Sequence, residues 1–249
     1  MEKEQRFGTT ETSDPCFHLE IFDNLYEGNL IITKRLTDAF IDKLVENKDK
    51  IILHCTVTGM GGSRLEPLVP IKEAMLAKTK ALIDKGFQVE QIVLRVDPII
   101  PTEKGVQTAI DTMKCFLPLG IRRIRISFLD MYNHVKERFY ESLNKLPYET
   151  FHADEQLREQ AIERILTEVT GDYELEFCGE PPTTKFKNIS NTPCLSQKDV
   201  DILGLTGKIK LEGNKGARRT CGCPENKTEL IKDKPRRCQN KCLYCFWKD

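Results

Sequence analysis

Segments with strand-like and helix-like patterns alternate along most of this 249-residue chain, and that alternation constrains the fold more than any other feature. Short β-rich runs occur at residues 30–33, 51–57, 89–96, 124–128 and 173–178. Apolar residues recur at helical spacing over residues 36–44, 71–83, 109–117, 135–143 and 157–169. Helical crossovers that join parallel strands produce this order. The sequence therefore predicts an α/β fold with a parallel sheet, either open or curled into a barrel.

The alternating pattern weakens after Pro181 and Pro182, where Lys, Asn, Gly and Cys become frequent. We therefore expect a partial α/β barrel over residues 1–180 and a cysteine-rich tail over residues 181–249. No apolar run reaches the length of a membrane span, and the charged start of the chain is unlike a signal peptide. These features predict a cytoplasmic protein without a membrane partner.

Most of the predicted strands end in a polar or charged residue next to Gly or Pro. Catalytic and binding groups of parallel α/β folds lie at this carboxyl end of the strands. Each such residue alone is more often a helix cap or a turn residue. Together they could line one polar cup, so our candidates for catalysis or substrate contact are Glu11, Asp97, Ser127, Asp130, Cys178 and Glu180.

The chain ends with three cysteines, Cys238, Cys242 and Cys245, at C-x-x-x-C-x-x-C spacing. Iron–sulfur clusters are normally held by four cysteine thiolates, so three on one loop would leave one iron of a 4Fe-4S cluster open to another ligand. Zinc is the competing interpretation, because a structural zinc site takes four Cys or His ligands. Cys221 and Cys223 together with two of the downstream thiols could form such a site.

The terminal motif resembles the signature of radical S-adenosyl-L-methionine (SAM) enzymes, in which the open iron binds SAM. Residues 12–15, 30–34, 53–58 and 65–67 resemble consecutive segments of the spore photoproduct lyases of that superfamily. An uncharacterised bacterial and phage family related to those lyases has a cysteine-rich C-terminus and three segments that are also found in this chain. They read here Leu65-Glu66-Pro67, Arg95-Val96-Asp97-Pro98-Ile99 and Ser127-Phe128-Leu129-Asp130-Met131-Tyr132.

This resemblance implies a partial barrel of radical SAM type, circularly permuted so that the cluster-bearing first segment comes last. It implies a 4Fe-4S cluster held by Cys238, Cys242 and Cys245, SAM as the second cofactor, and an electron donor such as a flavodoxin or ferredoxin. Lys34 matches a lysine that contacts the SAM carboxylate. The residues assigned to SAM binding, from the resemblance and from neighbouring strand ends, are Ser13, Lys34, Thr56, Thr58, Ser127, Tyr244 and Phe246.

The resemblance also implies cleavage of SAM to a 5′-deoxyadenosyl radical that abstracts hydrogen from a substrate. Glu11 stands where the lyases carry the cysteine that returns hydrogen to the product, so the lyase reaction itself is not implied. We expect the substrate to be a pyrimidine base in DNA, or a nucleotide. A lyase or isomerase would act in repair, or in rearrangement of a modified thymine as in phage DNA hypermodification.

The charge distribution leaves two interpretations of the tail open. Residues 205–241 contain eleven Lys or Arg against four Asp or Glu, whereas the whole chain contains 38 of each kind. This basic stretch is either a phosphate-facing patch or a solvated tail. The alternative function is a non-catalytic zinc-binding protein that interacts with nucleic acid, and the metal content of the purified protein separates the two functions.

Overall fold

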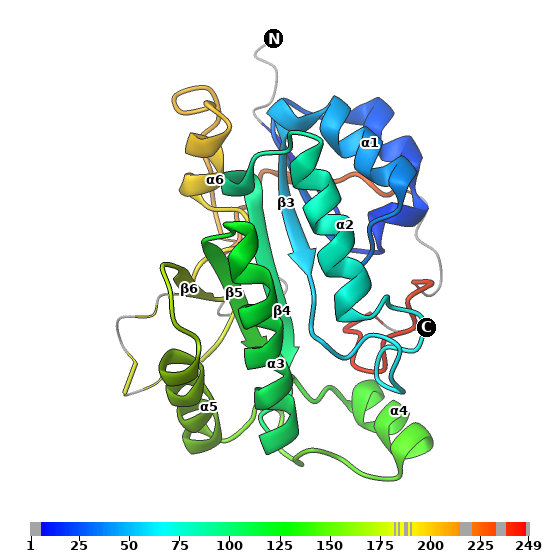
Figure 1. Cartoon of the computed structure of the whole chain (residues 1–249), viewed down its shortest axis with the longest axis vertical. Helices are drawn as coiled ribbons and strands as arrows, with labels where there is room; N and C mark the ends of the chain where they lie inside the picture. The colour runs from blue at the N-terminus through cyan, green and yellow to red at the C-terminus, as the bar shows by residue number, and fades with distance from the viewer. Residues whose placement is uncertain are drawn as a thin grey trace.

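The computed structural model describes residues 6–181, 183, 185–186, 189, 191–214, 221–232 and 238–247. One sheet of seven parallel strands runs through this part of the chain, in the order β6-β5-β4-β3-β2-β1-β7 (Figure 1). The strands are β1 Phe7–Thr9, β2 Asn29–Thr33, β3 Ile51–Thr56, β4 Ile92–Ile99, β5 Arg123–Phe128, β6 Glu174–Phe177 and β7 Lys227–Glu229. The predicted α/β fold with a parallel sheet is therefore confirmed.

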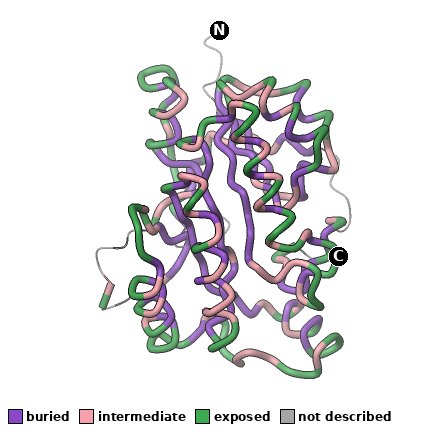
Figure 2. The backbone as a smooth tube through the Cα atoms, in the orientation of Figure 1, coloured by how far each residue is buried: buried purple, intermediate pink, exposed green. Residues whose placement is uncertain are grey.

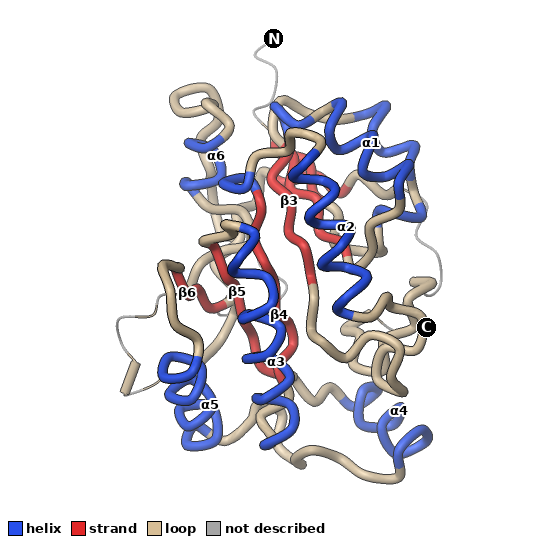
Figure 3. Tube along the Cα trace, in the orientation of Figure 1, coloured by secondary structure: helices blue, strands red, loops and turns tan. Residues whose placement is uncertain are grey.

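Six α-helices accompany the sheet in the described residues (Figure 3). They are α1 Asp38–Glu46, α2 Lys72–Asp84, α3 Glu103–Phe116, α4 Asn133–Leu143, α5 Glu155–Glu168 and α6 Gln197–Ile202. Short 3₁₀ helices occur at Pro15–Phe17, Leu19–Asn24, Lys48–Lys50, Val89–Gln91 and Leu117–Leu119. Within the described ranges, no helix is both long and apolar enough to cross a membrane.

Polar residues in the sequence mark where several helices begin. The hydroxyl of Thr37 accepts the N–H of Phe40 at 3.3 Å at the start of α1, and Thr102 caps α3 in the same way. The carboxylate of Asp154 accepts the N–H of Gln156 at 2.9 Å at the start of α5. These side chains satisfy N–H groups that have no partner inside the helix, so each helix begins directly after its capping residue.

Side chains alternate between the two faces of the sheet along each strand, and different elements cover the two faces. Ile124 and Ile126 of β5 pack with apolar residues of α3 and α5 in the main core. On the opposite face, Ile52 and Val93 pack with Val200 of α6 in a second apolar cluster. Figure 2 shows the resulting pattern, with buried strands and with helices that are exposed on their outer sides.

The face towards α6 also carries buried arginines of β5, each with a carboxylate partner. Arg123 donates to Asp199 of α6 at 2.8 Å, and Arg125 donates to Glu176 of β6 at 2.6 Å. Arg125 also donates to the carbonyl oxygen of Cys194 at 3.0 Å. A buried guanidinium is unfavourable without such partners, so these bonds fix α6 and the segment before it against the sheet.

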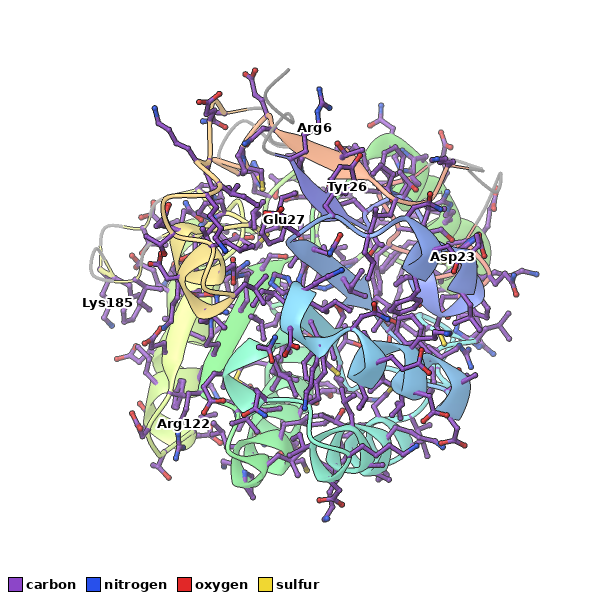
Figure 4. The ribbon with its side chains drawn as sticks, turned by 90° about the horizontal axis from the view of Figure 1, so that it is seen from above. Arg6, Asp23, Tyr26, Glu27, Arg122 and Lys185 are labelled. Atoms are coloured by element: carbon purple, nitrogen blue, oxygen red, sulfur yellow. The ribbon has the colours of Figure 1, made fainter. Side chains whose placement is uncertain are left out.

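The tail contributes an edge strand, because β7 pairs in parallel with β1. Gly8 lies opposite Thr228, and the N–H of Leu230 donates to the carbonyl oxygen of Thr9 at 2.8 Å. Arg6, labelled beside this strand in Figure 4, donates to the hydroxyl of Thr228 at 3.4 Å. Residues after 180 therefore take part in the sheet, and the domain boundary expected there stays a prediction.

Two kinds of difference separate the predicted elements from the observed ones. The predicted strand 89–96 begins only at Ile92, because Val89–Gln91 forms a 3₁₀ turn. The Gln91 amide stabilises that turn by donating to the carbonyl oxygens of Lys48 at 2.6 Å and Ile51 at 2.8 Å. β1, β7 and α6 have no counterpart among the predicted segments, because strands of three residues and a helix of six are too short to show a period.

Replacing Asp199 by Ala should lower the free energy of unfolding by about 3–5 kcal/mol, because Arg123 would stay buried without its partner. The change also removes the capping box that Asp199 forms with Ser196. Urea unfolding followed by circular dichroism measures the loss. Lys80→Ala removes only the exposed pair with Asp84 and should leave the urea midpoint nearly unchanged. Equal losses in the two variants would contradict the role of the Arg123–Asp199 pair.

Candidate functional site

The terminal loop, residues 238–247, lies at the carboxyl end of the sheet beside the loop that follows β3 (Figure 1). The N–H of Leu243 donates to the carbonyl oxygen of Leu65 at 3.0 Å. The side chain of Asn240 donates to Asp14 at 2.7 Å, and the same carboxylate accepts the N–H of Lys34 at 2.9 Å. Asp14 therefore ties the terminal loop to the end of β2.

The terminal loop is also held by α4 and by the segment after β1. Arg138 of α4 donates to the carbonyl oxygens of Cys245 and Trp247, both at 2.9 Å. The indole N–H of Trp247 donates to the carbonyl oxygen of Glu11 at 2.9 Å. Nε2 of His134 lies 2.9 Å from the carbonyl oxygen of Phe246. Because its backbone is bonded from several sides, the loop gives its thiols fixed positions.

The three terminal thiols are close enough to influence one another's protonation. Burial is the main cause that raises the pKa of Cys242 to about 12, and Lys34 opposes this shift, while the thiolates of Cys245 and Cys238 add to it. Burial also raises the pKa of Cys245. Free thiols of this kind stay protonated at neutral pH, but a metal ion deprotonates the thiols that bind it. As free thiols, Cys242 and Cys245 are therefore poor nucleophiles at neutral pH.

A buried polar network lies next to these thiols. Lys34 donates to Oε1 of Glu66 and to the hydroxyl of Tyr244, both at 2.9 Å, and to the carbonyl oxygen of Asp97 at 3.5 Å. Thr58 donates to Oε2 of Glu66 at 2.6 Å, and Tyr244 donates to Oε1. The Glu66 side chain is only 1% exposed, so the protein itself must satisfy its charge.

Lys34 keeps its positive charge in this network. Burial alone would lower the pKa of Lys34, but the charge of Glu66, the hydrogen bond to it and the charge of Asp97 outweigh that effect, and the pKa is raised. A cation beside Cys242 can offset the negative charge of metal-bound thiolates or bind the anionic group of a ligand.

The glycine-rich segment after β3 brings Glu66 to this place. A Cβ added to Gly61 would lie 2.0 Å from the carbonyl oxygen of Pro70, and Gly59 has a φ of +78°. The N–H of Gly62 donates to the carbonyl oxygen of Glu66 at 3.0 Å. Close approach at one position and a left-handed backbone at the other both require glycine. The glycines thus fold the loop tightly enough to turn Glu66 under the terminal loop.

Asp97 is the centre of a second polar group at the end of β4. Its carboxylate accepts hydrogen bonds from Arg95 and Ser127. Burial alone would lower the pKa of Arg95, but Asp97 and the thiolates of Cys194 and Cys178 raise it above its usual value. A cation and a hydroxyl therefore fix the orientation of the Asp97 carboxylate.

The structure brings many of the predicted site residues together at the carboxyl ends of β2 to β5. Those joined by the hydrogen bonds described above are Lys34, Thr58, Asp97, Ser127 and Tyr244. Thr56 is the last residue of β3 and is buried. The predicted set thus contains a connected core that includes one residue of the terminal loop.

Other predicted site residues lie outside this network. Oγ of Ser13 lies 3.3 Å from Nε2 of His18. Glu11 forms an ion pair with Lys227 of β7 at 2.6 Å. Cys178 belongs to a separate group of thiols on the face of the sheet that α6 covers. Nothing in these contacts tests the catalytic roles predicted for Glu11 and Cys178.

An exposed aromatic surface borders the terminal loop. An open hollow of about 640 Å³ is lined by Tyr132, Asn133, His134, Phe151, Phe246 and Trp247. The ring centroid of Tyr132 lies 5.1 Å from that of Phe246 and 4.8 Å from that of Phe151. Phe246 and Trp247 are 41% and 43% exposed. Packed rings with open faces can stack on a planar ligand such as a nucleobase.

Two residues of the site have no role in the sequence analysis. Glu66 occurs in the quoted Leu-Glu-Pro segment, four residues after Gly62, but nothing local in the sequence shows that it bonds to Lys34 and Tyr244. Arg138 is an ordinary basic residue of an amphipathic helix by pattern. Its contact with the terminal loop, 107 residues away from it in sequence, depends on tertiary structure alone.

Comparison with known proteins gives one strong match. The profile of a family described as "Domain of unknown function (DUF1848)" matches residues 27–247. No curated protein is similar enough to match the chain. Among solved structures, a point mutant of the Thermobaculum terrenum O-GlcNAc hydrolase is similar, with 18% identity and a TM-score of 0.36. That match covers 82% of this chain but only 40% of the hydrolase chain, and a likeness this low carries no argument about activity.

Replacing Glu66 by Gln should lower the free energy of unfolding at pH 8 by about 3 kcal/mol, because Lys34 becomes a buried cation without its carboxylate. The folded-state pKa of Lys34 is raised above 10.5, so the stability from the pair is present below pH 10.5 and is lost as the pH rises through the folded-state pKa. The difference in the free energy of unfolding between Glu66→Gln and the wild type, measured by urea unfolding, should therefore become smaller at high pH. Glu46→Gln, which removes the exposed partner of Lys43, is the control. A constant difference at every pH would contradict this charge pairing.

Proposed function

This chain belongs to the DUF1848 domain family, and we propose that it is a radical SAM enzyme whose terminal cysteines hold a 4Fe-4S cluster. The observation that carries the proposal is the position of the terminal loop. Three thiols on a well-anchored loop lie at the carboxyl end of a parallel sheet, next to the buried Lys34–Glu66 pair. The resemblance of the C-x-x-x-C-x-x-C motif to the radical SAM signature supplies the identity of the metal centre.

Cys238, Cys242 and Cys245 fit such a cluster by their chemistry. All three are free of disulfides, and their thiolates act on one another electrostatically. Lys34 and Arg138 lie close enough to offset part of the negative charge of the bound thiolates. When bound, the reduced cluster supplies one electron that breaks a C–S bond of SAM, releasing methionine and a 5′-deoxyadenosyl radical able to abstract hydrogen from a substrate.

Residues around the terminal loop offer partners for the chemical groups of SAM. Lys34 is the partner for the carboxylate, and Glu66 and Tyr244 fix the direction of its ammonium group. Phe246 offers an aromatic face for the adenine ring. Of the other residues assigned to SAM, Thr58 and Ser127 use their hydroxyls to orient Glu66 and Asp97, whereas Ser13 and Thr56 would contact SAM directly.

The strand order supports a circularly permuted partial barrel. β7 comes last in the chain but lies beside β1, and the terminal loop follows it. In a permuted barrel, the last strand takes the place of the first and carries the cluster loop at its carboxyl end. Seen along the strands in Figure 4, the segment with α6 lies on one side of the sheet and α1 to α3 lie on the other.

We further propose a nucleobase substrate, most simply a thymine or another pyrimidine in DNA, for a lyase or isomerase reaction. The aromatic surface at Phe246 and Trp247 supports it, because exposed rings next to the terminal loop would stack on a base. The basic stretch 205–241 would bind phosphates, although its residues 215–220 and 233–237 lie outside the described residues. A flavodoxin or ferredoxin would supply the electron.

A non-catalytic zinc-binding protein that interacts with nucleic acid is the second candidate. Buried thiols away from the terminal loop favour it, because Cys194, Cys221 and Cys223 form a potential metal group. In this group the partner of Cys221 and Cys223 is Cys194, and not a thiol of the terminal loop as the sequence suggested. The two candidates differ in what the terminal loop holds, and iron with acid-labile sulfide there would exclude the second.

Anaerobically reconstituted protein, reduced with dithionite in the presence of SAM, should release 5′-deoxyadenosine. Cys242→Ala should abolish this release, because it removes one of three cluster ligands. Liquid chromatography with mass spectrometry measures the product, and iron and sulfide assays measure the cluster.

Cys115→Ala is the matched control, because Cys115 lies on α3, away from the terminal loop. It should keep its iron and its 5′-deoxyadenosine release. A colourless protein without iron, or release that persists in Cys242→Ala, would overturn the proposed function.

Trp247→Ala should weaken binding of a thymine-containing single-stranded oligonucleotide about 5- to 150-fold, the equivalent of the 1–3 kcal/mol that one stacked base contributes. Fluorescence anisotropy of the labelled oligonucleotide gives the affinity. Trp247 is the only tryptophan of the chain, so quenching of its own fluorescence reports stacking directly. Tyr140→Ala removes an exposed aromatic ring that does not line the hollow, and should bind like wild type. Equal binding by all three proteins would contradict a base-stacking surface.

A further inference from the structure

Four cysteines from three distant segments meet on the face of the sheet that α6 covers. Sγ of Cys178, directly after β6, lies 3.4 Å from Sγ of Cys194, and it also contacts Cys221. Sγ of Cys221 lies 3.0 Å from Sγ of Cys223. The sulfur atoms of Cys194, Cys221 and Cys223 all lie within 4.8 Å of one another. All four side chains are buried.

This spacing fits one tetrahedral metal ion. With Zn–S bonds of about 2.3 Å, tetrahedral geometry places the four sulfur atoms about 3.8 Å apart. The Cys178–Cys194 pair at 3.4 Å lies near that value, and the Cys221–Cys223 pair at 3.0 Å is shorter. Cys194, Cys221 and Cys223 form the tight group, and Cys178 lies beside it, next to Cys194 and Cys221. In a 4Fe-4S cluster each thiolate binds a different iron, so its cysteine sulfurs lie farther apart than they do around a single ion. The geometry therefore favours a mononuclear site.

The local backbone also suits a chelate. Gly222, between Cys221 and Cys223, has a φ of +63°, a left-handed conformation that turns the two flanking thiols to the same side. The N–H of Cys194 donates to Sγ of Cys223 at 3.3 Å. Polar donors around sulfur stabilise thiolates in a buried site.

Charged groups on the sheet complement a tetrathiolate. Four thiolates around one Zn²⁺ carry a net charge of −2. Nη2 of Arg95 lies 3.9 Å from Sγ of Cys178, and Arg125 donates to the carbonyl oxygen of Cys194 at 3.0 Å. Arg95 also pairs with Asp97 and Arg125 with Glu176, so the two guanidinium groups contribute N–H donors next to the thiols rather than uncompensated positive charge.

We propose that Cys178, Cys194, Cys221 and Cys223 bind one zinc ion as a closed structural site, separate from the terminal thiols. On binding, the four thiols lose their protons to solvent, and no electron is transferred. The site joins the end of β6, at one edge of the sheet, to the segment that leads into β7, at the other edge. Zinc would thereby fasten the tail across the sheet and help to place the terminal loop.

The test uses the full chain with Cys238, Cys242 and Cys245 all replaced by Ala, so that iron at the terminal loop does not interfere. Inductively coupled plasma mass spectrometry should find about one zinc per chain, and X-ray absorption should find four sulfur neighbours at about 2.3 Å. Adding Cys221→Ala and Cys223→Ala should remove the zinc. Adding Cys115→Ala instead should leave the zinc in place.

A second measurement keeps the proposal falsifiable if the variants lacking Cys221 and Cys223 do not fold. In the protein with an intact zinc site, a mercurial reagent should release zinc in step with the modification of four buried thiols, as read with a chromogenic chelator. A zinc-free folded protein, four free thiols or disulfides at these positions, or iron with sulfide in place of zinc would each overturn the proposal. None of these results depends on SAM cleavage, so failure here is distinct from failure of the proposed function.

Discussion

The buried carboxylate of Glu66 is the interaction on which the rest of the site depends. Lys34 at the end of β2, Thr58 after β3 and Tyr244 of the terminal loop all bond to it. A buried carboxylate without partners is strongly unfavourable, so these three segments must meet for the native packing to be stable. The same contact that fastens the terminal loop therefore also places a cation beside Cys242.

The parallel sheet explains how the two thiol groups obtain their surroundings. Alternation sends Leu53, Leu94 and Ile126 into the main core and sends His54, Arg95 and Arg125 to the face that α6 covers, beside Ile52 and Val93. Burial, followed by Arg125 and Arg95, lowers the pKa of His54 well below its usual range, so this histidine adds no charge. Arg95 and Arg125 are each paired with a carboxylate, so this layer is charge-balanced and offers N–H donors to the thiols next to it.

Local sequence patterns predict those parts of the molecule that are long enough to show a period. Helices such as α3 and strands such as β5 repeat their apolar positions several times, and they occur where the pattern places them. α6 and β7 are short, and their positions depend on the Asp199 pair and on the edge of β1. In the site, the resemblance identifies Lys34 and Tyr244. Glu66, which bonds to both of them, and Cys194, which lies beside Cys221 and Cys223, come from other segments of the chain. Their proximity is set by tertiary structure, which no local pattern encodes.

The pairing of β1 with β7 has a consequence for the order of assembly. The N–H of Glu11 donates to Glu229 across 218 residues of sequence, so this edge of β1 stays unpaired until β7 has been synthesised. Closing so long a loop costs conformational entropy that only the completed tail offsets. During that interval the bare backbone of β1 can accept a strand from any neighbouring chain. Docking of the tail therefore also protects this edge of the sheet against strand addition from another chain.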